Sequence, residues 1–114
     1  FNVSRPALFA ASAAIRDVSW LKKEVSHIRK WNKILYKKFK EMKIATNESK
    51  INFLLLNFDR VNISSKKVFQ KLGNAGILVR GMNVYGIKNS LRITVGKSKE
   101  NKKLISIFRK ILNV

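Results

Sequence analysis

The sequence predicts an α/β two-layer sandwich, in which a sheet of three or four strands carries helices on one face and follows a long helix. Two observations predict this class. Apolar or alternating runs at 52–58, 77–79 and 91–95 have the length and pattern of strands. Helical periodicity fills 18–42, 66–72 and the segment after Ser98. So few strands cannot complete a doubly wound sheet.

The length and composition of the chain indicate a single domain or a piece of one. It has 114 residues, of which 46% are hydrophobic, and this share supports a modest core. The absence of cysteine excludes disulfides, thiolate metal sites and cysteine nucleophiles. One histidine, His27, excludes the usual multi-histidine metal clusters. Because the sequence starts at Phe1 and not at methionine, we expect a fragment.

The formal net charge of +19 is typical of proteins that bind nucleic acid or an anionic membrane. Here, however, lysines are interleaved with asparagine and isoleucine along every segment, as the codon bias of an AT-rich genome produces. A small basic nucleic-acid-binding module remains the alternative function. Most aromatic side chains lie on apolar stripes and not on an exposed basic strand, which argues against base stacking. We therefore expect no specific nucleic-acid partner and no membrane.

The first helix is predicted to begin at Ser4-Arg5-Pro6, because proline is tolerated in a first turn. Its small apolar run, 7–15, also resembles a signal peptide with Ala11-Ser12-Ala13 as the cleavage site. The run is short and continues into another helix, so we favour close helix packing and a cytoplasmic protein.

Asp17 is a candidate N-cap for a long helix over 18–42. Apolar residues recur on alternating three- and four-residue steps, with the polar Asn32 among them. This pattern fits either a coiled coil or a long helix packed on its own domain, and the second is commoner. His27 lies off the stripe and is interpreted as solvated.

The later elements follow from local signals. The nearly continuous apolar run 52–58 predicts a strand covered on both faces or nearly so. Serines before Lys66 can cap the next helix, and Gly73 and Gly76 can end it. Ser98 can cap the last helix.

The stretch Gly76–Gly96 carries the candidate chemistry. Alternation over 91–95 places Leu91, Ile93 and Val95 on one face and Arg92 on the other. An arginine held on a strand with apolar backing presents a fixed fork to a carboxylate or phosphate. A plain surface arginine on an edge strand fits the pattern equally well.

Four segments in order carry a family resemblance: FNVSRPALFAASAAI, SKINFLLLNF, GILVR…YGIKNSLRITVG and KSKENKKLISIF. They resemble the C-terminal part of histidinol-phosphate aminotransferases, which are fold-type I PLP-dependent aminotransferases. The resemblance implies that 1–16 end the large cofactor-binding domain, that 17–43 form the helix linking the domains, and that 44–114 form the small C-terminal substrate-recognition domain. It also implies a homodimer and a role in histidine biosynthesis.

In that family the Schiff-base lysine for PLP lies in an S-K-x-x-G/A-x-x-G-x-R element upstream of the segment matching Phe1. Ser65-Lys66-Lys67 is similar only in its first two residues and lacks the G-x-R. We interpret Lys66 as a solvated lysine, so this chain alone is predicted to be inactive. Because the resemblance supplies neither catalytic nor cofactor-binding residues here, substrate recognition is what remains.

The resemblance assigns Arg92 to the anionic end of the substrate, namely the carboxylate of glutamate or 2-oxoglutarate and the phosphate of histidinol phosphate. It matches Arg80 with an arginine that assists with phosphate, and a loop-anchoring role for Arg80 is equally open. One departure is Lys97-Ser98-Lys99, where the family prefers threonine and acids at the start of the last helix.

Overall fold

The computed structural model describes residues 2–114, so Phe1, which starts the FNVS segment, lies outside the described residues. The elements in chain order are α1 (Arg5–Arg16), α2 (Val18–Glu41), β1 (Ala45–Thr46), β2 (Phe53–Asn57), α3 (Ser65–Asn74), β3 (Arg80–Gly81), the 3-10 turn η1 (Asn83–Tyr85), β4 (Ser90–Thr94) and α4 (Ser98–Leu112). The sheet order is β1-β2-β4-β3, and every neighbouring pair is antiparallel.

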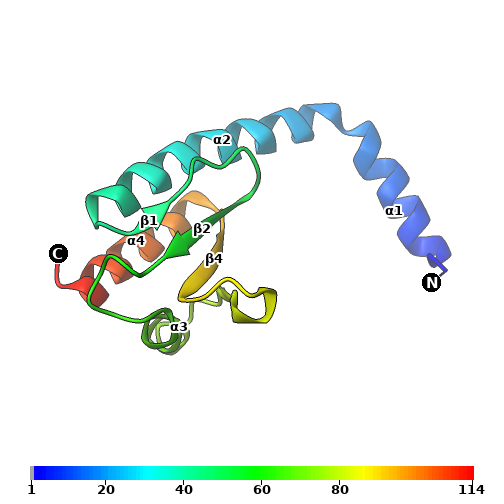
Figure 1. Ribbon diagram of the computed structural model, residues 1–114. Coiled ribbons are helices and arrows are strands. Elements are labelled where there is room, and N and C mark those ends of the chain that lie inside the picture. The colour runs from blue at the N-terminus through cyan, green and yellow to red at the C-terminus, as the bar shows by residue number, and fades with distance from the viewer. Residues whose placement is uncertain (1) are drawn as a thin grey trace.

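The core lies between the sheet and the helices α2, α3 and α4, which pack on one sheet face (Figure 1). Leu54 and Leu56 of β2 and Leu91 and Ile93 of β4 point into it, each at most 2% exposed. Helix side chains meet them, and the fully buried ones are Leu35, Phe39, Val68, Leu72 and Phe108. The predicted two-layer α/β class, with helices on one face of a four-stranded sheet, is confirmed.

Capping explains where two of the helices begin. The Asp17 carboxylate accepts a hydrogen bond from the backbone N–H of Trp20 at 2.9 Å. The Ser64 hydroxyl accepts one from the N–H of Lys67 at 3.4 Å. Both bonds satisfy amide donors that a helix start leaves unpaired, so the predicted caps are confirmed.

One strand prediction is wrong, and the predicted burial of a second strand is met only in part. The run 77–79 forms no strand, because the Ile77 N–H returns to the Leu72 carbonyl at 2.9 Å and closes the end of α3. In this part of the chain only Arg80 and Gly81, which form β3, pair with β4. Leu78 is 94% exposed. The strand predicted at 52–58 is present as β2, but its two faces differ: Leu54 and Leu56 are buried, whereas Phe53 and Leu55 on the other face are half-buried.

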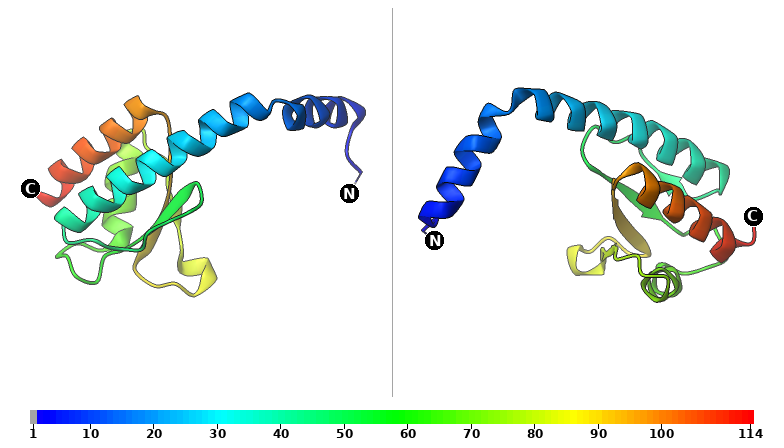
Figure 2. Two further views of the ribbon diagram at one scale, coloured as in Figure 1. Left: turned by 90° about the horizontal axis from the view of Figure 1, so that it is seen from above. Right: turned by 180° about the vertical axis from the view of Figure 1, so that it is seen from behind.

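Helix α2 packs on its own domain along its second half, where Trp31, Leu35 and Phe39 are buried, as favoured over the coiled coil. Its first turns and all of α1 stand apart, and α1 has no buried residue (Figures 1 and 2). The large apolar side chains exposed there are Leu8, Phe9, Ile15, Val18, Trp20 and Leu21. No helix within residues 2–114 combines the length and hydropathy needed to cross a membrane.

Candidate functional site

Within residues 2–114 the helices pack on one face of the sheet, and we call the opposite face the open face. Strand alternation sends Leu54, Leu56, Leu91 and Ile93 to the core, so the residues between them lie on the opposite side. The ladder register then aligns three side chains across three strands: Leu55 of β2, Arg92 of β4 and Arg80 of β3. Both arginines that the sequence singled out therefore share one face.

Arg92 is held firmly but is not neutralised. Its side chain is half-buried, and its guanidinium carbon lies 4.9 Å from the centroid of the Phe53 ring, within the range of a cation–π contact. Its Nε atom is buried and has no hydrogen-bond partner among the described residues. Within 2–114 the one ion pair joins Lys38 to Glu41 at 2.7 Å, and none involves Arg92. The guanidinium is thus oriented by the ring and has no counter-ion among the described residues, as a candidate anion-binding group requires.

Arg80 is exposed and lies directly opposite Arg92 in the ladder. Its guanidinium carbon is 5.1 Å from the centroid of the Tyr85 ring, and its Nη2 donates a hydrogen bond to the Tyr85 hydroxyl. Both roles considered for Arg80 are compatible with this geometry: the bond to Tyr85 anchors the loop, and the position beside Arg92 suits an anion.

Two functional candidates were not predicted from the sequence, Phe53 and Tyr85. Both lie in segments that carried the family resemblance, but only the strand register and the path of η1 show that each ring lies against an arginine. Phe53 is paired with Thr94, two residues from Arg92 on the same face, so the contact is a diagonal one between strands. The contact between Phe53 and Arg92 could be predicted only if the β2–β4 register were known.

The turn after β4 is fixed by a network centred on the Gly96 peptide. The buried Asn101 side chain donates to the Gly96 carbonyl at 2.7 Å and accepts from the Gly96 N–H at 2.9 Å. His27 also bonds that carbonyl through Nε2 at 2.9 Å. The interpretation of His27 as solvated is therefore wrong, because the turn from β4 comes back against α2. This network explains why Asn101 follows Glu100 in the first turn of the last helix.

Ser98 does not cap α4 as expected. The helix begins at Ser98 itself, and the Glu100 carboxylate accepts a hydrogen bond from the Lys97 N–H at 2.7 Å. The Ser98 hydroxyl instead accepts a bond from the indole N–H of Trp31 at 3.0 Å, which joins α4 to α2. The lysines flanking Ser98 thus leave the helix start intact, because Glu100 supplies the acid.

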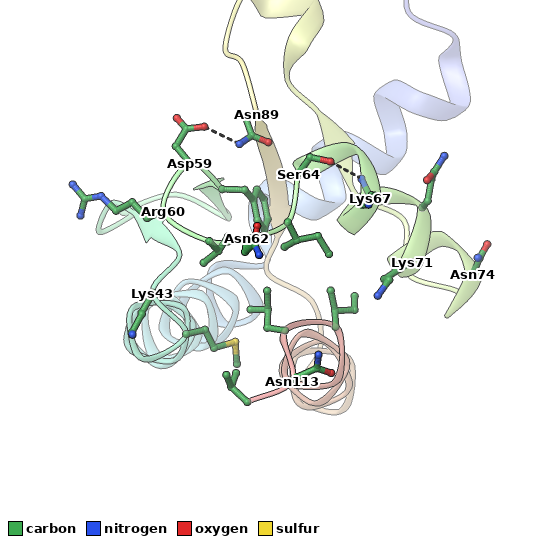
Figure 3. A pocket seen from close by; sticks show the side chains of 18 residues that line it. Lys43, Asp59, Arg60, Asn62, Ser64, Lys67, Lys71, Asn74, Asn89 and Asn113 are labelled. Carbon is green, nitrogen blue, oxygen red and sulfur yellow. Dashed lines mark hydrogen bonds between the residues drawn. The ribbon is translucent and has the colours of Figure 1, made fainter.

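A separate cleft of 1250 Å³ lies between α3, the end of α4 and the loop after β2 (Figure 3). Its rim bears Lys43, Arg60, Lys67 and Lys71, and neither Arg80 nor Arg92 lines it. Its carboxylate, Asp59, accepts hydrogen bonds from Asn89 and Asn57, which lower the pKa of Asp59. The basic side chains on this rim are exposed, and none has a buried nitrogen without a hydrogen-bond partner, as Arg92 has. We therefore place the candidate site on the open face.

Residues 1–108 match the family described as aminotransferase class I and II. The chain belongs to this family. It is 42% identical over 115 residues to the histidinol-phosphate aminotransferase of Pelagibacter ubique, a match that covers 99% of the chain and 32% of the relative. It is 42% identical over 113 residues to the histidinol-phosphate aminotransferase of Campylobacter jejuni, a match that covers 98% of the chain and 30% of the relative. The chain thus spans about a third of the length of these curated relatives.

Solved structures of the family share this fold. The histidinol-phosphate aminotransferase from Clostridium acetobutylicum superposes with a TM-score of 0.76 at 22% identity, covering 85% of this chain and 30% of that one. The aspartate aminotransferase from Thermotoga maritima gives 0.73 at 14% identity, covering 98% of this chain and 29% of that one. At such identities the likeness concerns the fold alone.

Enzymes of this family depend on PLP, which needs a lysine amine for its Schiff base. The lysines within 2–114 are unsuited to forming it, because all are exposed except Lys38, which is half-buried and paired with Glu41. Lys66 is exposed on the first turn of α3. A catalytic lysine is usually desolvated so that its amine is neutral at working pH. Among the described residues Arg92 therefore remains a candidate anion-binding residue, and no lysine has the buried, unpaired setting that favours a Schiff base.

Proposed function

We propose that this chain is the C-terminal substrate-recognition part of a PLP-dependent aminotransferase, specifically a histidinol-phosphate aminotransferase. It would transfer an amino group between histidinol phosphate and 2-oxoglutarate in histidine biosynthesis. The observation that carries the proposal is the oriented, unneutralised guanidinium of Arg92 on the open face, with Arg80 opposite it. The family membership and the two relatives at 42% identity support the choice of reaction.

In this account Arg92 receives the anionic end of each substrate in turn. A planar guanidinium donates two parallel N–H bonds to a carboxylate or to two oxygens of a phosphate, so one residue serves both anions. The Phe53 ring stabilises the guanidinium before the substrate arrives, which lowers the entropy lost on binding. Arg80 adds a second positive charge for the phosphate, which carries more charge than one carboxylate.

PLP enzymes of this type use a lysine for the Schiff base and an acid that keeps the pyridinium nitrogen protonated. We assign both residues to the part of the relatives that this chain does not span. We assign 1–16 to the end of the large domain, 17–43 to the linking helix and 44–114 to the small domain. The exposed apolar side chains of α1, such as Phe9 and Ile15, each 78% exposed, support this division, because such a surface is normally buried against other protein. A homodimer in the cytoplasm completes the proposal.

The test uses the full-length enzyme, meaning this chain preceded by the part that its relatives have in addition. The purified enzyme is loaded with PLP, and amino transfer to 2-oxoglutarate is measured from histidinol phosphate and, separately, from aspartate. We expect kcat/KM for histidinol phosphate to exceed that for aspartate by about 100-fold, since two arginines favour the phosphate. Equal use of both donors, or no transfer from histidinol phosphate, would contradict the proposal.

A further inference from the structure

The two arginines of the open face each lie against a different aromatic ring. They are direct partners in the ladder, where like charges repel, and no carboxylate among the described residues separates them. Arg92 leans toward Phe53, which pairs with Thr94 at one end of β4. Arg80 leans toward Tyr85, which lies in the turn before the other end of β4.

We propose that Tyr85 is a positioning residue that holds Arg80 for phosphate, so that Tyr85 controls the use of the phosphate-bearing substrate but not of the dicarboxylate. The inference rests on the proposed function. One carboxylate is satisfied by the fork of Arg92 alone. A phosphate monoester carries close to two charges and needs a second guanidinium within reach.

Arg80 needs such support because it is exposed on a two-residue strand. An exposed arginine samples many rotamers, and ordering it on substrate binding weakens affinity. The Tyr85 ring and hydroxyl restrict the guanidinium from two directions, by a cation–π contact and by a hydrogen bond. Arg80 is therefore ordered before the substrate arrives.

Tyr85 can hold Arg80 only because its own backbone is fixed. The Tyr85 N–H donates to the Met82 carbonyl at 3.0 Å, and the Met82 N–H donates to the Ser90 carbonyl at 3.2 Å, which ties η1 to the β3–β4 ladder. Gly86 then turns the chain with a φ of +74°, a conformation that glycine adopts without strain. The ring is thus attached to the same ladder as both arginines.

The experiment compares Tyr85→Leu, Tyr85→Phe and Val84→Ala in the full-length enzyme loaded with PLP. Val84 is the neighbouring control, because its side chain is 84% exposed and makes no contact with either arginine among the described interactions. We expect Tyr85→Leu to raise KM for histidinol phosphate about tenfold and to change KM for 2-oxoglutarate less than about twofold, with kcat and Tm unchanged. Tyr85→Phe keeps the ring and loses the hydroxyl, so its effect should be intermediate. Val84→Ala should match the wild type.

Three results would overturn the inference alone: equal changes in both KM values, a lower KM for histidinol phosphate, or a fall in Tm that accounts for the loss of activity. In each of these the wild-type enzyme still uses histidinol phosphate. A wild-type enzyme that does not accept histidinol phosphate instead overturns the proposed function, and this inference with it.

Discussion

The guanidinium of Arg92 lies over the ring of Phe53, with 4.9 Å between its carbon and the ring centroid. Phe53 reaches it diagonally across the β2–β4 ladder, on the open face of the sheet. An aromatic face attracts a cation and makes no hydrogen bond that would consume the guanidinium donors. Phe53 can therefore fix Arg92 in place and leave its N–H groups free for a substrate anion.

The first prediction concerns this contact. Phe53→Leu removes the ring but keeps an apolar side chain, so Arg92 becomes less ordered. We expect kcat/KM of the full-length enzyme to fall about fivefold, as for a cation–π contact of about 1 kcal/mol. The free energy of unfolding should fall by less than about 1.5 kcal/mol, because Phe53 is only half-buried. Steady-state kinetics and urea unfolding measure the two effects.

The control for Phe53 is Phe69→Leu. Phe69 is 45% exposed on α3, and no arginine lies over its ring among the described residues. Its substitution should leave kcat/KM unchanged. If both phenylalanine variants behave alike, the ring of Phe53 has no special role in holding Arg92.

The second prediction compares two glycines. A Cβ added at Gly96 would come 2.6 Å from the Glu100 carboxylate and 3.2 Å from the Glu100 Cβ, so Gly96→Ala must displace the cap of α4. We expect a loss of about 1–2 kcal/mol in the free energy of unfolding. Gly73→Ala meets nothing within 4 Å inside α3 and should stabilise by about 0.5–1 kcal/mol. Urea unfolding tests both, and a stabilising Gly96→Ala would refute the cap argument.

Local signals were enough to predict much of the fold. The caps Asp17 and Ser64 and the alternation around Arg92 depend on neighbouring residues only, and all three are present in the structure. The errors arose where distant segments decide the outcome. The segment 77–79 was expected to form a strand, but its first residue, Ile77, instead bonds to the end of α3. His27 forms a hydrogen bond with the Gly96 carbonyl, which lies in a turn distant in the sequence.

The candidate site was predictable in its arginines but not in their surroundings. Alternation alone places Arg92 opposite the core, and the family resemblance adds Arg80. The aromatic partners Phe53 and Tyr85 depend on strand register and on the path of η1, which a single sequence does not determine. The incomplete burial of one face of β2 was also not predicted, because a continuous apolar run looks the same whether one or both faces are fully covered.

The third prediction concerns pH and Asp59. Hydrogen bonds from Asn89 and Asn57 lower the pKa of Asp59 below its ordinary value of 3.8. Because the folded-state pKa is the lower one, the stabilising contribution is present above about pH 3.8 and is lost as pH falls through the folded-state pKa. We expect Asp59→Asn to be less stable than the wild type near neutral pH, with the difference shrinking below pH 3.8. Urea unfolding between about pH 5 and pH 2 measures this.

Glu48→Gln provides the matched control for Asp59, because its side chain is exposed and forms no ion pair among the described residues. Its stability should follow the wild-type curve at every pH, apart from the general effect of one fewer negative charge on a chain of net charge +19. A constant difference between Asp59→Asn and the wild type across the whole pH range would show that Asp59 does not titrate as argued.

The fourth prediction concerns the lysines. Because every lysine within 2–114 is exposed except Lys38, which is paired with Glu41, none should form a stable Schiff base with PLP. Borohydride reduction of the isolated chain with PLP, followed by mass spectrometry, should give scattered, substoichiometric pyridoxyl adducts. One stoichiometric adduct on a single lysine would mean that the chain itself contains the cofactor site.

The most direct measurement of the central claim is the kinetics of Arg92→Lys in the full-length enzyme, with Lys88→Ala as the control in the nearby loop. Lysine keeps the charge but loses the two-pronged fork. We predict that kcat/KM falls about 100-fold, or about 3 kcal/mol, for histidinol phosphate and for 2-oxoglutarate, while PLP binding and Tm change little. Lys88→Ala should resemble the wild type. An Arg92→Lys enzyme that loses stability while its folded fraction keeps normal kinetics would show that Arg92 is structural and would contradict the account.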